Sequence, residues 1–234
     1  AAKRLFFEAL DHPVGRRAAF VETACGGNDA LRREVQAWFT PAGLREIMGP
    51  EEGGETDRIT REWLGRAGKR WRPFLTVCAW KALQEDQDAA IPLSLKQLAV
   101  AMECFHKASL IHDDIEDGDA YRYGMETLHR RHGVGPAINI GDYLVGWGYR
   151  LLARDRQSVG PVVAADLLAK FSDAHVKLAE GQGAELLWRQ GSEKALKPID
   201  ALRIYALKTA PAFEAALGAG IRLAGDHPEL DKTV

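Results

Sequence analysis

Apolar residues recur at helical spacing along most of the chain from residue 57 onward. Six segments carry this pattern: 59–66, 74–84, 94–113, 134–152, 159–188 and 199–223. Because side chains three and four positions apart share one face of a helix, the pattern predicts a helix for each segment. No segment alternates apolar and polar residues between hairpin turns, so we expect almost no strand. The predicted fold class is therefore all-α, a helical bundle.

The last of these helices, 199–223, contains a proline. Pro211 predicts a kink or a break, because proline lacks the N–H donor and its ring clashes with the preceding turn. Leu202, Tyr205 and Leu217 follow the apolar spacing, so we expect them in the core.

The first 40 residues carry a separate pattern of short helices. Apolar spacing predicts one helix near 5–10 and a second at 14–24, which Gly26 and Gly27 would close. A third helix would place four apolar side chains on one face: Leu31, Val35, Trp38 and Phe39.

The stretch at 41–56 separates these short helices from the rest of the chain. It holds two prolines and four glycines, which is typical of a linker. We therefore expect a small N-terminal helical extension at 1–40, a linker at 41–56 and a main domain at 57–234.

Charge and cysteine usage narrow the possible partners. The net charge is −2, which gives no overall basic field for nucleic acid. No apolar run reaches the ~18 to 20 residues that span a bilayer, and the first ten residues lack the apolar region of a signal peptide. Cys25, Cys78 and Cys104 show no paired spacing, which fits a reducing compartment. We expect a cytoplasmic protein that neither binds nucleic acid nor spans a membrane.

The stretch 105–119, FHKASLIHDDIEDGD, holds the main candidate for chemistry. It begins as an apolar helical run and ends in acidic residues. Asp113 and Asp117 are four positions apart and share a helix face, and Asp114 lies beside them. Carboxylates this close repel one another unless a cation lies between them. Their hard oxygen atoms suit Mg²⁺, which binds through one or two carboxylates plus substrate phosphates.

The alternative is that these acidic residues form a solvated helix end. Two features argue against it. Acidic residues near a helix C-terminus oppose the macrodipole. Basic residues also follow at Arg122, Arg130 and Arg131, where they could hold an anion opposite the metal.

Four motifs in order resemble one protein family. LIHDDIEDGD at 110–119 is similar to the first aspartate-rich region of the trans-isoprenyl diphosphate synthases, the polyprenyl synthetase family. GKRWRP at 68–73 resembles the isopentenyl diphosphate motif of that family. GQGAE at 181–185 and LKTA at 207–210 follow in the order of the family. The resemblance covers about residues 57–234 and implies a helical bundle of the isoprenoid synthase type.

The resemblance implies a Mg²⁺-dependent prenyl transferase, a homodimer in the family pattern, that condenses an allylic diphosphate with isopentenyl diphosphate. Asp113, Asp114 and Asp117 would bind Mg²⁺ on the allylic diphosphate, and Arg122 would contact the same diphosphate. The remaining carried-over positions are Lys69, Arg72 and His106 for isopentenyl diphosphate, Lys208 and Thr209 for the diphosphate and the reacting region, and Gln182 in GQGAE.

Each of these assignments has a structural alternative. Lys69 and Arg72 could be a solvated helix start, and His106 could be a core histidine with satisfied hydrogen bonds. Glu185 stands where the family usually has aspartate, and it could simply pair with Arg189 one turn later.

Two departures from the family pattern bear on the function. Tyr123 stands where the family has its second arginine, which removes a charge from the isopentenyl side. The second aspartate-rich motif would follow the LKTA helix, but the sequence ends first, at Val234, so we expect a chain truncated before that motif. These departures support an alternative, a catalytically weak homologue that acts as a binding or regulatory subunit. A related terpene cyclase is a third possibility, which GKRWRP argues against because a cyclase needs no second diphosphate site.

Product length is suggested by the residues before Asp113. Ala108 and Ser109 are small, so a growing chain could pass them, and Phe105 and Met102 could form a floor one turn further. By resemblance, this pattern implies geranylgeranyl diphosphate or a longer product. The alternative is that these two residues are small for helix packing alone.

Overall fold

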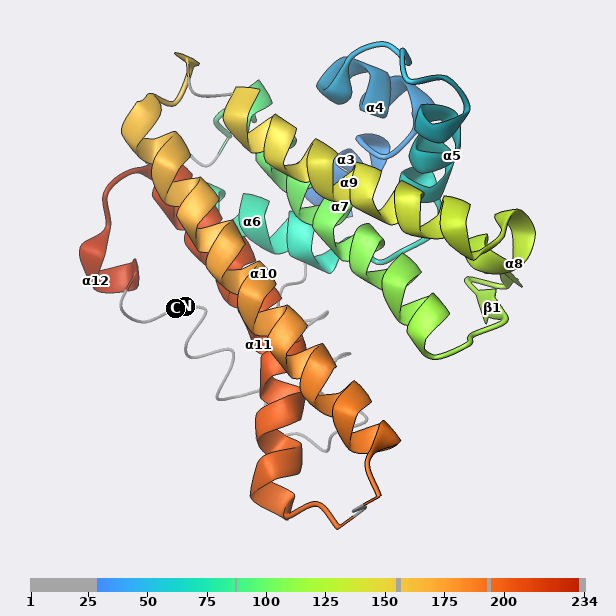
Figure 1. Ribbon diagram of the computed structural model, residues 1–234. Coiled ribbons are helices and arrows are strands. Elements are labelled where there is room, and N and C mark those ends of the chain that lie inside the picture. Colours follow the sequence, from blue (N-terminus) through green and yellow to red (C-terminus); the bar gives the residue numbers. More distant parts are fainter. Residues whose placement is uncertain (1–28, 87, 155–156, 193–194, 232–234) are drawn as a thin grey trace. The chain divides into compact units, whose positions relative to one another are not determined.

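The structure is a computed structural model that describes residues 29–86, 88–154, 157–192 and 195–231 (Figure 1). By its internal contacts the chain divides into two units, Ala1–Ala37 and Trp38–Val234. The helices expected near 5–10 and 14–24 lie outside the described residues.

The described part of the first unit is one helix, α3 (Asp29–Ala37). Leu31 and Val35 lie one turn apart on it, as expected. Trp38 and Phe39 were expected on the same helix face, but α3 ends before them and both belong to the second unit.

The second unit begins with a helix where the sequence predicted a linker. α4 (Pro41–Met48) starts at Thr40, whose side chain accepts a hydrogen bond from the Gly43 backbone N–H at 3.2 Å. Its apolar residues Leu44, Ile47 and Met48 are buried. The linker prediction is therefore wrong for 41–48. The proline starts this helix and Gly49, with φ of 95°, ends it, so neither residue breaks it.

Eight further helices in the described residues complete the unit. They are α5 (Gly54–Gly65), α6 (Trp71–Lys81), α7 (Leu93–Glu116), α8 (Leu128–His132), α9 (Val134–Arg154), α10 (Pro161–Gln190), α11 (Pro198–Ala224) and α12 (Pro228–Asp231). α7 packs along α9, and α10 packs along α11, which also packs against α6 (Figure 1). The all-α prediction is confirmed. No helix among the described residues is long and apolar enough to cross a membrane.

A short hairpin follows α7 directly. β1 (Tyr121–Arg122) pairs antiparallel with β2 (Met125–Glu126). Tyr123 and Gly124 form the turn, with φ of 55° and 74°. Positive φ at both central residues is typical of the type I′ turns of two-residue hairpins, and it is costly for tyrosine.

The last long helix excludes a break at Pro211 and corrects one expectation about the core. α11 continues through Pro211, which is buried, so the helix does not break there. Leu202 and Tyr205, expected in the core, are 63% and 69% exposed. Apolar spacing identifies a helix face but does not show whether another element covers that face.

Candidate functional site

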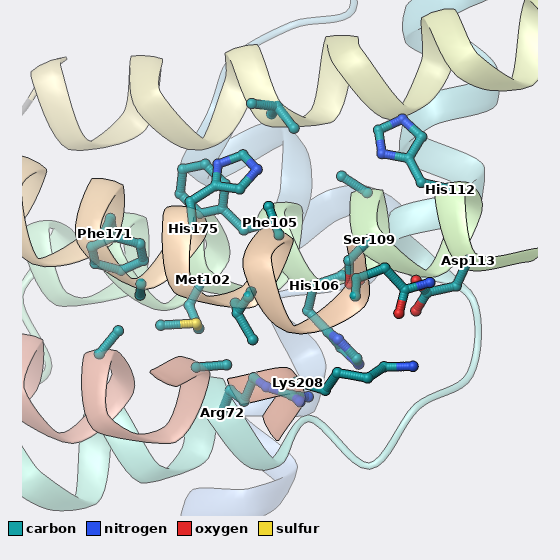
Figure 2. Close-up of a pocket in the computed structure, with 18 of the residues that line it drawn as sticks. Arg72, Met102, Phe105, His106, Ser109, His112, Asp113, Phe171, His175 and Lys208 are labelled. Carbon is teal, nitrogen blue, oxygen red and sulfur yellow. The ribbon is translucent and has the colours of Figure 1, made fainter. Parts of the chain in front are cut away.

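A cavity of about 230 Å³ lies between the long helices of the second unit (Figure 2). α7 contributes most of one wall, because residues 102, 105, 109, 112 and 116 recur at helical spacing. The opposite walls come from α10, from α11 and from Arg72 on α6. Figure 2 shows Asp113 and Lys208 toward one end of the cavity and Met102 and Phe171 toward the other. The site is therefore charged at one end and mainly apolar at the other, where His175 also lies beside Phe105.

The apolar end is built around the ring of Phe105. Its centroid lies 4.9 Å from that of Tyr149 and 5.4 Å from that of Phe171. The ring fits because α9 has Gly148 at the contact, where a Cβ would come within 2.6 Å of Phe105. Met102, Ala108 and Ser109 also line the cavity, and their roles as floor and path for a growing chain stay predictions.

Asp113 is the predicted aspartate that lines the cavity. Burial raises the pKa of Asp113 to about 6, and the nearby carboxylates of Glu116 and Asp117 add to this rise against the opposing charge of Lys208. An ionised carboxylate at this position is therefore poorly solvated, and a cation would stabilise it.

Three predicted nitrogen-bearing side chains line the cavity near Asp113: Arg72, His106 and Lys208. Burial lowers the pKa of Arg72, whose guanidinium lies 4.9 Å from the ring centroid of Phe213. Burial also lowers the pKa of His106 to about 3, and the charge of Arg72 contributes. His106 is consequently neutral at pH 7, whereas Arg72 supplies positive charge.

Lys208 and Gln182 are held by carboxylates at the rim. Lys208 Nζ donates to Glu185 Oε2 at 2.6 Å, and Gln182 Nε2 donates to Glu116 Oε2 at 2.6 Å. Glu185 is thus an ion-pair partner of Lys208 as well as of Arg189, which lies 3.1 Å away. The pair between Glu185 and Arg189, which was the structural alternative for this residue, is present.

The other predicted residues do not line the cavity. Asp114 is buried and pairs with Arg122, which also lies 3.3 Å from Asp119. Asp117 pairs with Arg189. The predictions that these residues act on substrate stay predictions.

Lys69 and Thr209 also lie away from the cavity lining. Lys69 is exposed in the loop before α6, and Thr209 is half-buried on α11 beside Lys208. The structure therefore brings together one part of the predicted set, Arg72, His106, Asp113, Gln182 and Lys208.

These residues offer the kind of ligand atom that Mg²⁺ prefers, but not a complete set of ligands. Asp113 offers hard oxygen atoms at the cavity, and Asp114 has a buried Oδ2 without a hydrogen-bond partner among the described residues. Within the described ranges, however, no three His, Cys, Asp or Glu side chains converge as a metal site. The expected set of three aspartates is not assembled here, because Arg122 and Arg189 hold two of them.

Sequence reasoning missed the contribution of α10 to the cavity. Phe171, Ala174, His175 and Leu178 line it together with Gln182. These positions recur at spacings of three and four, which mark one helix face. The signal was present in the sequence, but the same spacing also describes an ordinary buried face.

The all-helical fold and its half-polar, half-apolar cavity define a protein of the isoprenoid synthase type. A model of the polyprenyl synthetase family matches residues 55–234, and the chain belongs to that family.

Relatives and solved structures agree with this assignment. The chain is 31% identical over 147 residues to a geranylgeranyl pyrophosphate synthase from Geoglobus acetivorans, covering 63% of this chain and 44% of the relative. It is 33% identical over 168 residues to a geranylfarnesyl diphosphate synthase from Aeropyrum pernix, covering 70% and 51%. A solved geranylgeranyl pyrophosphate synthetase from Geoglobus acetivorans superposes with a TM-score of 0.74 at 25% identity, covering 86% of this chain and 63% of that one. The chain spans about half the length of the curated relatives it matches.

Proposed function

We propose that the protein is a Mg²⁺-dependent prenyl transferase that condenses an allylic diphosphate with isopentenyl diphosphate. The observation that carries this proposal is the division of one cavity into a charged end, with Asp113, Arg72 and Lys208, and an apolar end around Phe105. A prenyl diphosphate has the same division, with an anionic head and a hydrocarbon tail. The names of the relatives support the same substrate class.

The reaction class explains why both ends are needed. The allylic carbon–oxygen bond breaks, which leaves a carbocation on the hydrocarbon and a diphosphate anion. The double bond of isopentenyl diphosphate then attacks the carbocation, and a proton leaves. Separation of charge is the hard step, so fixed cations must stabilise the departing diphosphate while apolar walls exclude water.

The residues of the chain divide these tasks. Arg72 and Lys208 provide positive charge from two different helices, and an arginine can bind phosphate oxygens bidentately. His106 is neutral and can donate or accept one hydrogen bond without adding charge. The aromatic rings at the apolar end exclude water from the hydrocarbon.

Asp113 would hold Mg²⁺, with Asp117 four positions later, directly after the last residue of α7. Bound Mg²⁺ supplies Lewis-acid stabilisation of the diphosphate oxygens. For Asp114 and Asp117 to share in this, their pairs with Arg122 and Arg189 would have to open. We propose that a diphosphate, which also attracts both arginines, favours that opening.

The cavity supports a product of geranylgeranyl length or longer. Ala108 and Ser109 leave the path beside α7 open, and Phe105 with Met102 closes it further along. Gly148 allows Phe105 to lie deep against α9, so the floor is set back from the charged end. The expected homodimer remains a proposal that rests on the family resemblance, and the cytoplasmic location remains one that rests on cysteine usage.

A turnover assay tests the proposed function. Labelled isopentenyl diphosphate is incubated with geranyl or farnesyl diphosphate and Mg²⁺, using the full-length protein and its Asp113→Asn variant. We expect prenyl product from the protein and a loss of about 100-fold or more in the variant, because Asp113 faces the cavity. Asp173→Asn, an exposed aspartate on α10 outside the cavity, is the matched control and should retain activity.

The same assay separates the alternatives. Binding of allylic diphosphate without turnover would favour the binding or regulatory subunit. Conversion of an allylic diphosphate alone into a cyclic hydrocarbon would favour a terpene cyclase. Absence of any diphosphate binding would overturn the proposal.

A further inference from the structure

Lys107 is a fully buried cation that the proposed function leaves unused. It lies on α7 next to His106, and its relative exposure is 0%. Burial lowers the pKa of Lys107 to about 7, and the charge of Arg70 adds to this effect. A buried ammonium group is costly unless its surroundings stabilise it, so its contacts indicate its role.

The ammonium group of Lys107 holds the backbone of one loop. Lys107 Nζ donates hydrogen bonds to the carbonyl oxygens of Arg66 at 3.2 Å and Ala67 at 3.1 Å. These residues begin the loop that joins α5 to α6, which also contains Lys69. The loop is therefore tied to α7 immediately before the positions that resemble the isopentenyl diphosphate motif.

A second buried cation holds the other end of the same loop. Arg70 has a left-handed backbone with φ of 51° and forms a buried ion pair with Glu103 of α7. Its guanidinium also donates to the carbonyl oxygens of Leu64 at 2.8 Å and Arg66 at 2.6 Å. Glu103 thus forms its ion pair with Arg70. Its charge also favours the charged form of Lys107, and further groups around Lys107 add to this stabilisation.

Two aromatic rings are among these groups. Lys107 Nζ lies 4.2 Å from the ring centroid of Tyr123 and 5.2 Å from that of Trp63. Trp63 is fixed in turn, because its Nε1 donates to the carbonyl oxygen of Lys107 at 3.1 Å. Tyr123 reaches this position from the hairpin turn that follows the aspartate-rich helix, despite its unfavourable φ of 55°. Its hydroxyl oxygen also lies near Gly68, 3.8 Å from where a Cβ would stand.

We propose that Lys107 and Tyr123 form a matched pair of positioning residues, which fixes the loop at 66–70 and so presents Lys69 and Arg72 to the second diphosphate. This inference rests on the proposed function. The pair explains why tyrosine is suited to position 123 in this chain. An arginine there would place a second cation against the buried ammonium, whereas a tyrosine ring attracts it.

The test is a mutant cycle with Lys107→Met, Tyr123→Arg and the double variant in the full-length protein. Steady-state kinetics give KM for isopentenyl diphosphate, KM for the allylic diphosphate and kcat. Lys107→Met should raise KM for isopentenyl diphosphate about tenfold and change the other two constants about twofold or less. Tyr123→Arg alone should also raise this KM, because it brings two cations together.

The double variant decides whether the two residues act as a pair. With the ammonium removed, the guanidinium introduced at position 123 no longer meets a buried cation. KM for isopentenyl diphosphate should therefore recover by about fivefold or more relative to Tyr123→Arg. The proposal would be overturned if the two substitutions changed KM for isopentenyl diphosphate by independent factors that multiply in the double variant. A lower KM caused by Tyr123→Arg alone would also overturn it.

Thermal unfolding of the same proteins without ligand separates this proposal from the proposed function. The two substitutions should show coupled rather than additive shifts in Tm. The Tm of Tyr123→Phe, which keeps the ring, should stay close to that of the unaltered protein, whereas the Tm of Tyr123→Leu should fall. If the unaltered protein neither binds nor converts a diphosphate, the proposed function fails, and additive shifts in Tm would then overturn the pair as well.

Discussion

At the scale of single residues, burial shifts the pKa values of two neighbouring groups at the polar end of the cavity toward the neutral form. The pKa of Asp113 rises to about 6 and that of His106 falls to about 3, and burial is the largest cause of both shifts. At pH 7 the cavity lining therefore includes the carboxyl groups of Asp113 and Glu116, the neutral ring of His106, and the positive charges of Arg72 and Lys208. This set favours a multiply charged anion accompanied by a metal cation.

The neutral state of His106 predicts that the folded protein loses stability in acid. Its pKa is about 3 in the folded protein against an ordinary value of 6.5, so only the unfolded chain binds the proton between these values. Stability contributed by the neutral ring is thus present above pH 6.5 and is lost as pH falls toward 3, at up to about 1.4 kcal/mol per pH unit.

Urea unfolding at pH 7, 6, 5 and 4 measures this loss. His106→Gln should reduce the decline in the free energy of unfolding across that range. His132→Gln, at the end of α8 and outside the cavity, tests whether loss of any histidine has the same effect. If the free energy of unfolding fell equally with pH in the unaltered protein and in His106→Gln, His106 would not be the source of the acid sensitivity.

The raised pKa of Asp113 predicts that replacing this aspartate stabilises the folded protein, although the replacement removes activity. Its pKa of about 6 exceeds the ordinary value of 3.8, so its contribution to stability is full below pH 3.8 and is lost as pH rises through 6. Asp113→Asn should therefore raise the free energy of unfolding of the metal-free protein at pH 7.5 by about 1 kcal/mol, after allowance for solvent screening. Chemical denaturation measures the gain, and a destabilised variant would show that the carboxylate is needed for folding.

At the scale of elements, the cavity depends on helices that approach one another closely. α11 reaches α6 at Gly220, where a Cβ would overlap the Thr76 carbonyl oxygen and lie 2.9 Å from Ala79 Cβ. This contact fixes the separation between the helix that carries Lys208 and the helix that carries Arg72.

Two glycine substitutions test this packing. Gly220→Ala should lower the free energy of unfolding by about 2 kcal/mol or more, because a rigid backbone oxygen occupies the site of the new methyl group. Gly146→Ala is the control, since a Cβ on that α9 glycine meets nothing within 4 Å and alanine favours the helix by up to about 1 kcal/mol. Thermal or urea unfolding measures both, and a neutral Gly220→Ala would mean that α6 and α11 can separate freely.

At the scale of the whole molecule, the fold class and the order of helices were predictable from apolar spacing. The long helices α7, α9, α10 and α11 begin and end within a few residues of their predicted bounds. α4 was missed because Pro41 and Gly49 mark its two ends, and local composition does not distinguish a helix end from a break. Tyr205 was misplaced because periodicity marks an apolar face without showing what covers it.

The candidate site was predictable only in part, for a related reason. The sequence motifs identified Arg72, His106, Asp113, Gln182 and Lys208, which the structure brings to one cavity. Spacing along a helix could not show that Arg122 turns back to Asp114, because that contact depends on the hairpin after α7. The packing of Lys107 against an aromatic ring sixteen positions later was equally invisible in the sequence.

The product length of variants in the cavity wall tests the central claim most directly, because it reports both on prenyl transfer and on where the growing chain lies. Ser109→Phe narrows the path beside α7 and should shorten the product, whereas Phe105→Ala removes the floor and should lengthen it. Ser172→Phe is the control. Ser172 is an exposed serine with the same local hydrogen bond as Ser109, to the carbonyl oxygen three residues earlier, and it lies outside the cavity. Chromatography of the dephosphorylated products would show shorter and longer chains, in that order, if the cavity holds the hydrocarbon. An unchanged product from both variants of an active enzyme would contradict the account.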